Sequence, residues 1–220
     1  MEPNEPDEPP SEFPDPEDAD PELKKAFANQ LTTIILLMEG ILGVAGVMLG
    51  IWFEMRWLDL IRPDPFPILA GLIGGITLVG VHAALLFPGK DWNPLRQWIY
   101  KPFARTFLDR MRLLSVEDII LISIVSGCAE ELLFRGWFQT AYGIVPASIL
   151  FGVIHIWGKP GIPYGIYAIG IGFVLGGLFE YTGNLWAPVL AHTLNNFLGL
   201  VANKYNWTPD VPHPQPQPED

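Results

Sequence analysis

The sequence predicts an all-α membrane protein, a polytopic bundle of about six transmembrane helices between two disordered tails. Half of its 220 residues are hydrophobic, and the mean hydropathy is +0.28. Only 17% of the residues are charged, against roughly a quarter in an ordinary soluble domain. Several apolar stretches approach twenty residues, the length that a helix needs to cross about 30 Å of hydrocarbon. The lipid bilayer is therefore the first partner that we expect.

The negative charge of the chain is concentrated in its first residues. The formal net charge is −11, yet residues 1–22 alone hold ten acidic side chains, no basic ones and seven prolines. A segment of this composition cannot bury enough apolar surface to offset the entropy that it loses on ordering. We predict disordered tails over residues 1–22 and over the proline-rich residues 204–220, and we expect no nucleic-acid partner.

Between the tails, six apolar segments are expected to form helices. Ser115 followed by Asp118 resembles a capping box and predicts the start of the third segment. The fourth segment is short for a span, so it is tilted, re-entrant or part of one bent element. The turn Thr182-Gly183-Asn184 separates the last two segments. The six predicted segments cover residues 31–53, 66–87, 116 to about 139, 145–157, 162–181 and 185–202.

The distribution of basic residues predicts the orientation of the bundle. The loop over residues 88–114 holds six Lys or Arg side chains, whereas the loop over residues 54–65 holds two. Loops rich in Lys and Arg stay on the cytoplasmic side, so we place the loop over residues 88–114 there. We therefore predict an integral, multi-pass protein with six crossings and both termini in the cytoplasm. Residues 95–114 mix aromatic with basic side chains, which suits an interfacial helix. A plain basic loop fits the same pattern.

The third segment carries the charges that most need an explanation, Glu130, Glu131 and Arg135. A charge at the bilayer centre costs about 2.5 to 3.5 kcal/mol on insertion scales, so such residues usually face a protein interior and mark a functional site. Glu131 and Arg135 lie one helical turn apart and can form an ion pair, while Glu130 points about 100° away. Glu130 is then left to act as a general base. A purely structural ion pair is the alternative.

Two further polar clusters lie on later segments. His155 follows Phe151 by four residues, and Asn196 follows His192 by four, so each pair shares one face of a helix. A lone histidine in a membrane helix is more often a hydrogen bonder between helices than a catalyst. Two histidines on separate segments, together with a carboxylate pair, favour a catalytic site.

The three motifs together resemble those of a known family. Glu-Glu-x-x-x-Arg at 130–135, Phe-x-x-x-His at 151–155 and His-x-x-x-Asn at 192–196 occur in this order on successive membrane segments. This arrangement is similar to the CAAX protease and bacteriocin-processing family, also called CPBP or Abi, which includes the Ras-converting CAAX endopeptidases. The resemblance covers roughly residues 115–202. We predict a catalytic membrane core over residues 115–203. Residues 23–114 then form two transmembrane helices and a basic interfacial loop.

The resemblance implies an intramembrane endopeptidase of the CAAX type that works with a glutamate-activated water. It assigns Glu130 as the general base and His155 as a residue that holds the water. His192 and Asn196 would stabilise the oxyanion, and the pair at positions 131 and 135 would support the site. No cofactor is implied, and the expected partner is a membrane protein or a lipid-modified peptide.

Two alternatives to this hypothesis remain at the level of sequence. Glu130, His155 and His192 are also a possible donor set for a zinc hydrolase, although the chain has no His-Glu-x-x-His motif. A non-proteolytic membrane scaffold or an immunity protein of the bacteriocin type would use the same polar cluster to bind a partner or to hold helices together.

Glycines in the fifth segment predict close helix packing. Gly172 and Gly176 form a small-x-x-x-small pair, which lets another helix approach closely. That neighbour is either a helix of the same chain or a second copy, so a homodimer is one of the two outcomes.

Overall fold

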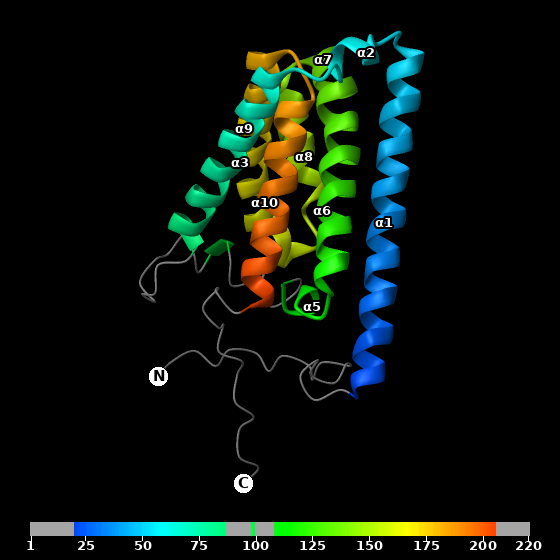
Figure 1. The fold of residues 1–220 in the computed structure, drawn as a ribbon, viewed down its shortest axis with the longest axis vertical. Helices are drawn as coiled ribbons and strands as arrows, with labels where there is room; N and C mark the ends of the chain where they lie inside the picture. Colours follow the sequence, from blue (N-terminus) through cyan, green and yellow to red (C-terminus); the bar gives the residue numbers. More distant parts are fainter. Residues whose placement is uncertain (1–19, 87–97, 100–107, 206–220) are drawn as a thin grey trace.

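A computed structural model describes residues 20–86, 98–99 and 108–205. Within these residues all the regular structure is helical, which confirms the predicted all-α class (Figure 1). The elements, in chain order, are α1 Pro21–Trp52, α2 Trp57–Leu60, α3 Pro65–Leu86, α5 Asp109–Met111, α6 Val116–Glu131, the π-helix η2 Leu132–Gln139, α7 Thr140–Tyr142, α8 Ile144–Ile154, the 3-10 helix η3 Lys159–Gly161, α9 Ile162–Thr182 and α10 Trp186–Lys204.

The long helices run side by side as a bundle (Figure 1). Helix α10 packs against both α3 and α6, α8 packs against α9, and α1 packs along α6 and η2. Polar residues are buried inside this bundle, among them Glu131 and Arg135. The core therefore encloses charges, and the outer surface is apolar.

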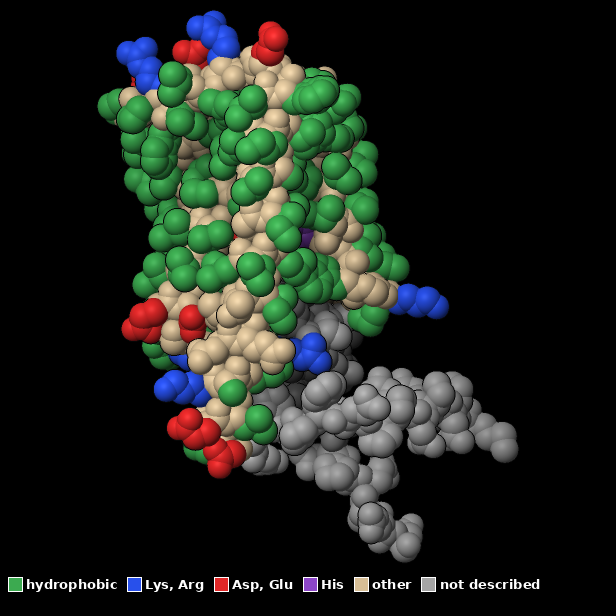
Figure 2. Space-filling model, turned by 90° about the vertical axis from the view of Figure 1, so that its right-hand side faces the viewer, with side chains coloured by type: hydrophobic (Ala, Val, Ile, Leu, Met, Phe, Trp, Pro, Cys, Tyr) green, Lys and Arg blue, Asp and Glu red, His purple; other side chains and the backbone are tan. Residues whose placement is uncertain are grey.

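The outer surface is that of a membrane protein. Figure 2 shows hydrophobic side chains over the middle of the molecule and most of the charged side chains near its two ends. Leu37, Ile41 and Met48 of α1 are among the exposed hydrophobic residues. The helices at 21–52, 65–84 and 159–182 are each long and apolar enough to cross a bilayer. The chain thus forms a helical membrane bundle.

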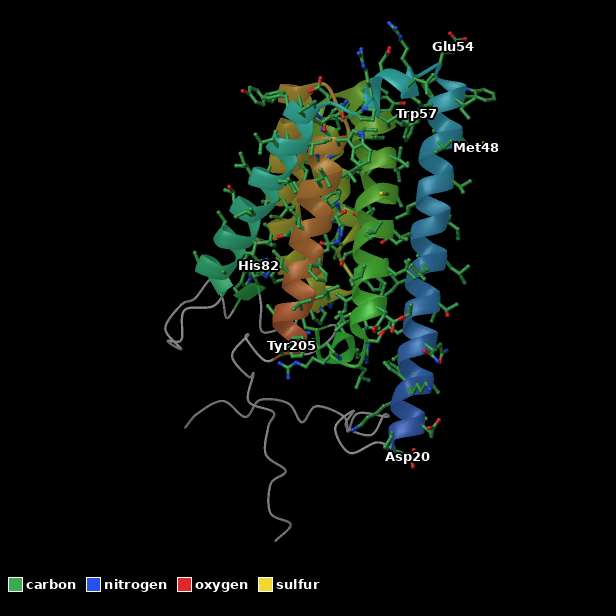
Figure 3. The ribbon with its side chains drawn as sticks, in the orientation of Figure 1. Asp20, Met48, Glu54, Trp57, His82 and Tyr205 are labelled. Atoms are coloured by element: carbon green, nitrogen blue, oxygen red, sulfur yellow. The ribbon has the colours of Figure 1, made fainter. Side chains whose placement is uncertain are left out.

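The ends of the described chain lie at the same end of the bundle. Figure 3 shows Asp20 and Tyr205 at one end, with Glu54 and Trp57 at the other. An even number of crossings requires this arrangement. The number of crossings and the side of the membrane on which the ends lie stay predictions.

Several predicted boundaries differ from the structure. Helix α1 begins at Pro21, ten residues before the predicted start of the first segment, so the last two residues of the predicted tail 1–22 are helical. The side chain of Asp20 accepts a hydrogen bond from the backbone of Glu22 and caps this start. Helix α10 includes Lys204, the first residue of the predicted second tail. The rest of both tails and most of the basic loop lie outside the described residues.

The third predicted segment begins as expected and then changes its helix type. The Ser115 hydroxyl accepts from the backbone of Asp118 at 3.0 Å, and Asp118 accepts in return from the backbone of Ser115, so the capping box is confirmed. From Leu132 onward the chain is a π-helix rather than an α-helix. The Thr140 hydroxyl donates to the carbonyl of Arg135 at 3.0 Å within this wider turn. Short π-helical segments often occur at functional sites.

The fourth predicted segment, 145–157, is shorter in the structure. Helix α8 ends at Ile154, and its 11 residues extend only about 16 Å, too little to cross a bilayer on their own. His155 is the residue that caps its end. The predicted segment therefore ends three residues early, but Phe151 and His155 still lie side by side as predicted, with ring centroids 4.8 Å apart.

Glycines bring the helices of the core close together. A Cβ atom at Gly172 would lie 3.0 Å from the Cα atom of Ser148, and one at Gly176 would lie 2.8 Å from the side chain of Ile144. The predicted close approach of the fifth segment is confirmed, and its neighbour is α8 of the same chain.

The turn between α9 and α10 is anchored to the connection between α2 and α3. Gly183 adopts the left-handed conformation with φ 63°, which favours glycine. The Asn184 amide donates to the carbonyl of Arg62 at 2.8 Å, and its oxygen accepts from the backbone of Trp186. These bonds fix the start of α10, the helix that carries His192.

Candidate active site

The predicted site residues converge inside the bundle. They come from four elements. Short separations link His155 to Glu130, and Arg135 and His192 to Glu131, while Asn196 lies one helical turn after His192. They are Glu130 and Glu131 at the end of α6, Arg135 in η2, His155 at the end of α8, and His192 and Asn196 in α10.

Glu131 is the centre of a fully buried charge network. Its Oε1 atom accepts hydrogen bonds from Nη1 of Arg135 and from Nδ1 of His192, each at 2.9 Å. The side chains of Glu131 and Arg135 are 0% exposed. The ion pair expected from the four-residue spacing is present, and His192 joins it as a third member that the sequence did not predict.

Arg135 is held by groups on two other helices. Its Nη2 atom donates to the carbonyl of Gly172 at 3.0 Å. Because glycine has no side chain, this carbonyl is accessible to the guanidinium. Its guanidinium carbon lies 4.5 Å from the ring centroid of Phe151, in a cation–π contact. The ring of Phe151 also packs against those of His155 and His192, with centroids 4.8 and 5.8 Å apart. Phe151 therefore packs against the arginine and both imidazoles and forms a wall of the site.

The orientation of His155 fixes the roles of its two nitrogens. Its Nδ1 atom lies 2.6 Å from the carbonyl oxygen of Phe151. A carbonyl only accepts, so Nδ1 carries a proton, and in the neutral ring Nε2 presents a lone pair. That Nε2 atom lies 3.8 Å from Oε2 of Glu130, which is too far for a direct hydrogen bond. A bridging molecule suits a polar separation of this size.

Glu130 is less isolated than the sequence suggested. Its side chain is only 7% exposed, and its Oε2 atom is buried with no hydrogen-bond donor among the described residues. The carboxyl group of Glu39, on α1, lies within hydrogen-bonding reach of Glu130. Glu39 was not among the predicted site residues, although it is the one charged residue between Lys25 and Trp52. That isolation in an apolar run was the signal that could have found it.

Asn196 is tied to the helix that carries the carboxylates. Its amide donates to the hydroxyl of Ser126 at 3.0 Å. Ser126 lies one turn before Glu130 on α6 and is buried. It too was not predicted, and its small polar side chain four residues before the carboxylate was the available signal.

The zinc alternative would need Glu130, His155 and His192 to meet around one ion. Among the residues that the structure describes, no three His, Cys, Asp or Glu side chains form a group that could hold a metal ion. One nitrogen of His192 is already bound to Glu131. The bond to Glu131 leaves the other ring nitrogen of His192 available, so the metal-free mechanism stays a prediction.

The remaining histidine of the described chain lies outside this cluster. His82 on α3 is 3.2 Å from the hydroxyl of Tyr167, and the two rings pack edge to face. This contact agrees with the packing role that a lone membrane histidine usually has.

Comparison with known proteins identifies the part of the chain that carries the site. The family described as "Type II CAAX prenyl endopeptidase Rce1-like" matches residues 112–198. We therefore call residues 112–198 the Rce1-like segment. The match confirms the resemblance to the CAAX proteases that the three motifs indicated, and the Rce1-like segment contains all six predicted site residues. Helices α1 and α3 lie outside it.

A bacterial relative matches about a third of the chain. The chain is 38% identical over 78 residues to the uncharacterized protein YpbD of Bacillus subtilis (strain 168). The aligned stretch makes up 36% of this chain and 41% of that protein, so the chain spans less than half of the relative's length. No solved structure matches the chain.

Proposed function

We propose that this chain is an intramembrane endopeptidase that hydrolyses a peptide bond of a membrane-associated or lipid-modified protein with a glutamate-activated water. The observation that carries the proposal is the 3.8 Å separation between Oε2 of Glu130 and Nε2 of His155, inside the bundle. A buried carboxylate opposite a histidine lone pair is costly unless a hydrogen-bond donor lies between them. Water is such a donor, and the Rce1-like segment supports the same reaction class.

Glu130 acts as the general base in this proposal. A water between Glu130 and His155 donates one hydrogen bond to each, because an ionised carboxylate and a neutral Nε2 atom are both acceptors. Glu130 takes a proton from the water as the water oxygen attacks the carbonyl carbon of the scissile bond. His155, held by the carbonyl of Phe151, keeps the water aligned for this attack.

The negative charge of the tetrahedral intermediate falls near His192. Because Nδ1 of His192 donates to Glu131, only an imidazolium can also donate from Nε2 to the oxyanion. The charges favour that form, since Glu130 and Glu131 outnumber the single cation of Arg135 and a positive His192 restores neutrality. Fixed donors in a site that excludes water stabilise such an intermediate strongly.

Asn196 is the second oxyanion donor. Its amide uses one N–H on the Ser126 hydroxyl and has another N–H available. When the intermediate collapses, the proton held by Glu130 passes to the leaving nitrogen and the C–N bond breaks. One water is consumed, one carboxylic acid and one amine are formed, and Glu130 returns to its ionised state.

The test uses purified protein in lipid vesicles with two reporters, a prenylated peptide and an unmodified transmembrane peptide. We expect cleavage of at least one reporter, and a loss of about 10²- to 10⁴-fold in Glu130→Gln and His155→Ala. Glu117→Gln, an exposed carboxylate on the same helix, and His82→Ala are the matched controls. Full activity of Glu130→Gln or His155→Ala would contradict the mechanism. Partner binding without any cleavage would favour the scaffold alternative.

A further inference from the structure

Glu39 is a charged residue in the middle of an apolar helix. It lies near the centre of α1, the helix Pro21–Trp52. No other charged residue occurs between Lys25 and Trp52. A carboxylate at such a depth costs a few kcal/mol unless it meets a partner in the protein interior. Its position outside the Rce1-like segment means that none of the three motifs accounts for it.

Close packing of α1 directs this side chain toward the active site. A Cβ atom at Gly43 would lie 3.2 Å from the side chain of Ala129, and one at Gly46 would lie 2.8 Å from the backbone of Leu133. These glycines let α1 lie against α6 and η2 next to the carboxylate pair. Glu39 is one turn before Gly43 and so faces the same helix, where its carboxyl group reaches that of Glu130.

The two carboxyl groups need a proton between them. The Oε2 atoms of Glu39 and Glu130 are both buried and find no donor among the described residues. Two ionised carboxylates within hydrogen-bonding reach of each other would repel in surroundings of low dielectric constant, so such pairs share one proton. A proton shared by Glu39 and Glu130 removes this repulsion and provides a hydrogen-bond donor for one of the two buried oxygens.

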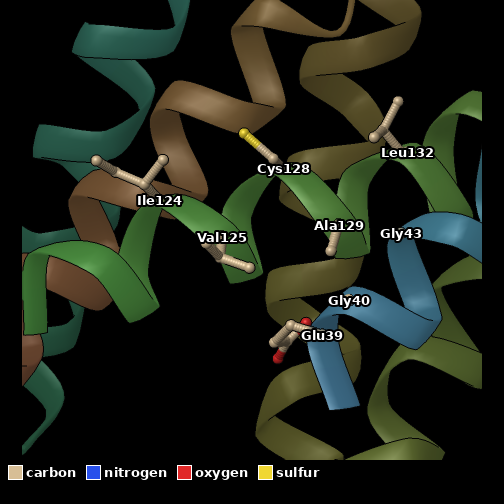
Figure 4. A pocket seen from close by; sticks show the side chains of 8 residues that line it. All are labelled: Glu39, Gly40, Gly43, Ile124, Val125, Cys128, Ala129 and Leu132. Atoms are coloured by element: carbon tan, nitrogen blue, oxygen red, sulfur yellow. The ribbon is translucent and has the colours of Figure 1, made fainter. Parts of the chain in front are cut away.

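The surroundings of each group indicate where that proton resides. Glu39 borders a pocket of about 260 Å³ between α1 and α6 whose other walls are glycine, aliphatic side chains and Cys128 (Figure 4). These groups offer no cation. Glu39 and Glu130 both interact electrostatically with His192, but of these two carboxyl groups only Glu130 also interacts with the cation of Arg135. The negative charge is therefore more stable on Glu130, and the proton on Glu39.

We propose that Glu39 is a positioning residue that stays protonated and donates a hydrogen bond to the carboxylate of Glu130. The bond orients the general base, keeps one of its oxygens directed at the water, and leaves the site with a single charge on this pair. This inference rests on the proposed function for its catalytic consequence, but the proton on Glu39 does not depend on that function.

Two substitutions separate a neutral donor from an ionised or structural residue. Glu39→Gln keeps the shape of the side chain and a hydrogen-bond donor to Glu130. Glu39→Leu removes that donor while α1 stays apolar. We expect the kcat of Glu39→Gln to stay near that of the wild type. The kcat of Glu39→Leu should fall about ten- to hundredfold, the size of a hydrogen bond to a charged group. KM should not change, because Glu39 does not contact substrate in this account. Met38→Ala, exposed on the neighbouring position, is the matched control.

An infrared difference spectrum between wild type and Glu39→Gln tests the proton without any activity. We expect a carbonyl stretch of a protonated carboxyl group that the Glu39→Gln variant lacks. Three outcomes would overturn the inference: no such band, a wild-type kcat for Glu39→Leu, or a Glu39→Gln variant as slow as Glu39→Leu. A wild type that keeps the band but cleaves neither reporter would overturn the proposed function, and with it the catalytic role of Glu39, while the shared proton would stand.

Discussion

Nδ1 of His192 lies 2.9 Å from Oε1 of Glu131, although 61 positions separate the two residues in the chain. The same oxygen accepts from Arg135. A single carboxylate oxygen thus connects α10 with α6 and η2 and orients the imidazole that we propose for the oxyanion. Glu131, which the sequence assigned only a supporting part, is the residue that both Arg135 and His192 contact.

The buried network predicts a large stability change when its cation is removed. Arg135→Met leaves Glu131 buried with only His192 as a partner. Breaking a buried ion pair from one side typically costs about 3 to 5 kcal/mol. We expect a marked fall in the thermal unfolding midpoint of the purified protein in detergent, measured by circular dichroism.

A double variant provides the control for this prediction. Replacing both members of a buried pair by apolar residues is often neutral or stabilising. Glu131→Met combined with Arg135→Met should therefore unfold at a higher temperature than Arg135→Met alone. A double variant less stable than the single one would show that the charge of Glu131 contributes more than its pairing with Arg135.

Local spacing made part of the site predictable from sequence. The pair Glu131 and Arg135 follows from four residues of separation on a helix, and the capping box at Ser115 follows from three. Both depend on neighbours along one element, and both are present in the structure. The membrane character of the bundle follows in the same way from the length of the apolar runs.

Features that depend on other elements could not be predicted. The π-helix over Leu132–Gln139 lies where Arg135 and Gln139 donate to the carbonyls of Gly172 and Gly176, contacts 37 positions away along the chain. The approach of Glu39 to Glu130 depends on how α1 packs against α6. Neither relationship has a periodicity that a single sequence reveals.

The oxyanion role of Asn196 predicts an effect on kcat. Removal of one oxyanion donor typically lowers kcat by about 10²- to 10³-fold, and we expect this for Asn196→Ala in the vesicle assay. Ser126→Ala removes only the acceptor that orients the amide, so a loss of about tenfold or less is expected. Equal losses in the two variants would mean that Asn196 acts by holding α10 to α6.

Glycine packing predicts opposite effects on stability for alanine substitutions at two glycines of α1, Gly40 and Gly46. A Cβ atom at Gly46 would lie 2.8 Å from the backbone of Leu133, whereas one at Gly40 would meet nothing within 4 Å. Gly46→Ala should therefore destabilise the protein by about 1 to 3 kcal/mol. Gly40→Ala should be neutral or stabilising by up to about 1 kcal/mol, since alanine favours helix. Unfolding midpoints of the two variants would distinguish this packing from a loosely attached α1.

Removal of metal ions should leave the proposed activity unchanged. The mechanism assigns water activation to Glu130 and His155 alone, without a Lewis acid. Exhaustive chelation followed by the vesicle assay is the measurement, with elemental analysis of the same sample. Stoichiometric zinc together with activity that chelation abolishes and zinc restores would replace the glutamate mechanism with a metal-dependent one.

In the proposed function, Glu130 activates water for proteolysis within the membrane. The most direct measurement compares membrane-protein fragments, by mass spectrometry, in cells that contain wild-type protein or the Glu130→Ala variant at equal levels in the membrane. We expect a set of fragments that occurs with the wild type and is absent with Glu130→Ala. The same fragments at the same abundance in both cell lines would contradict it.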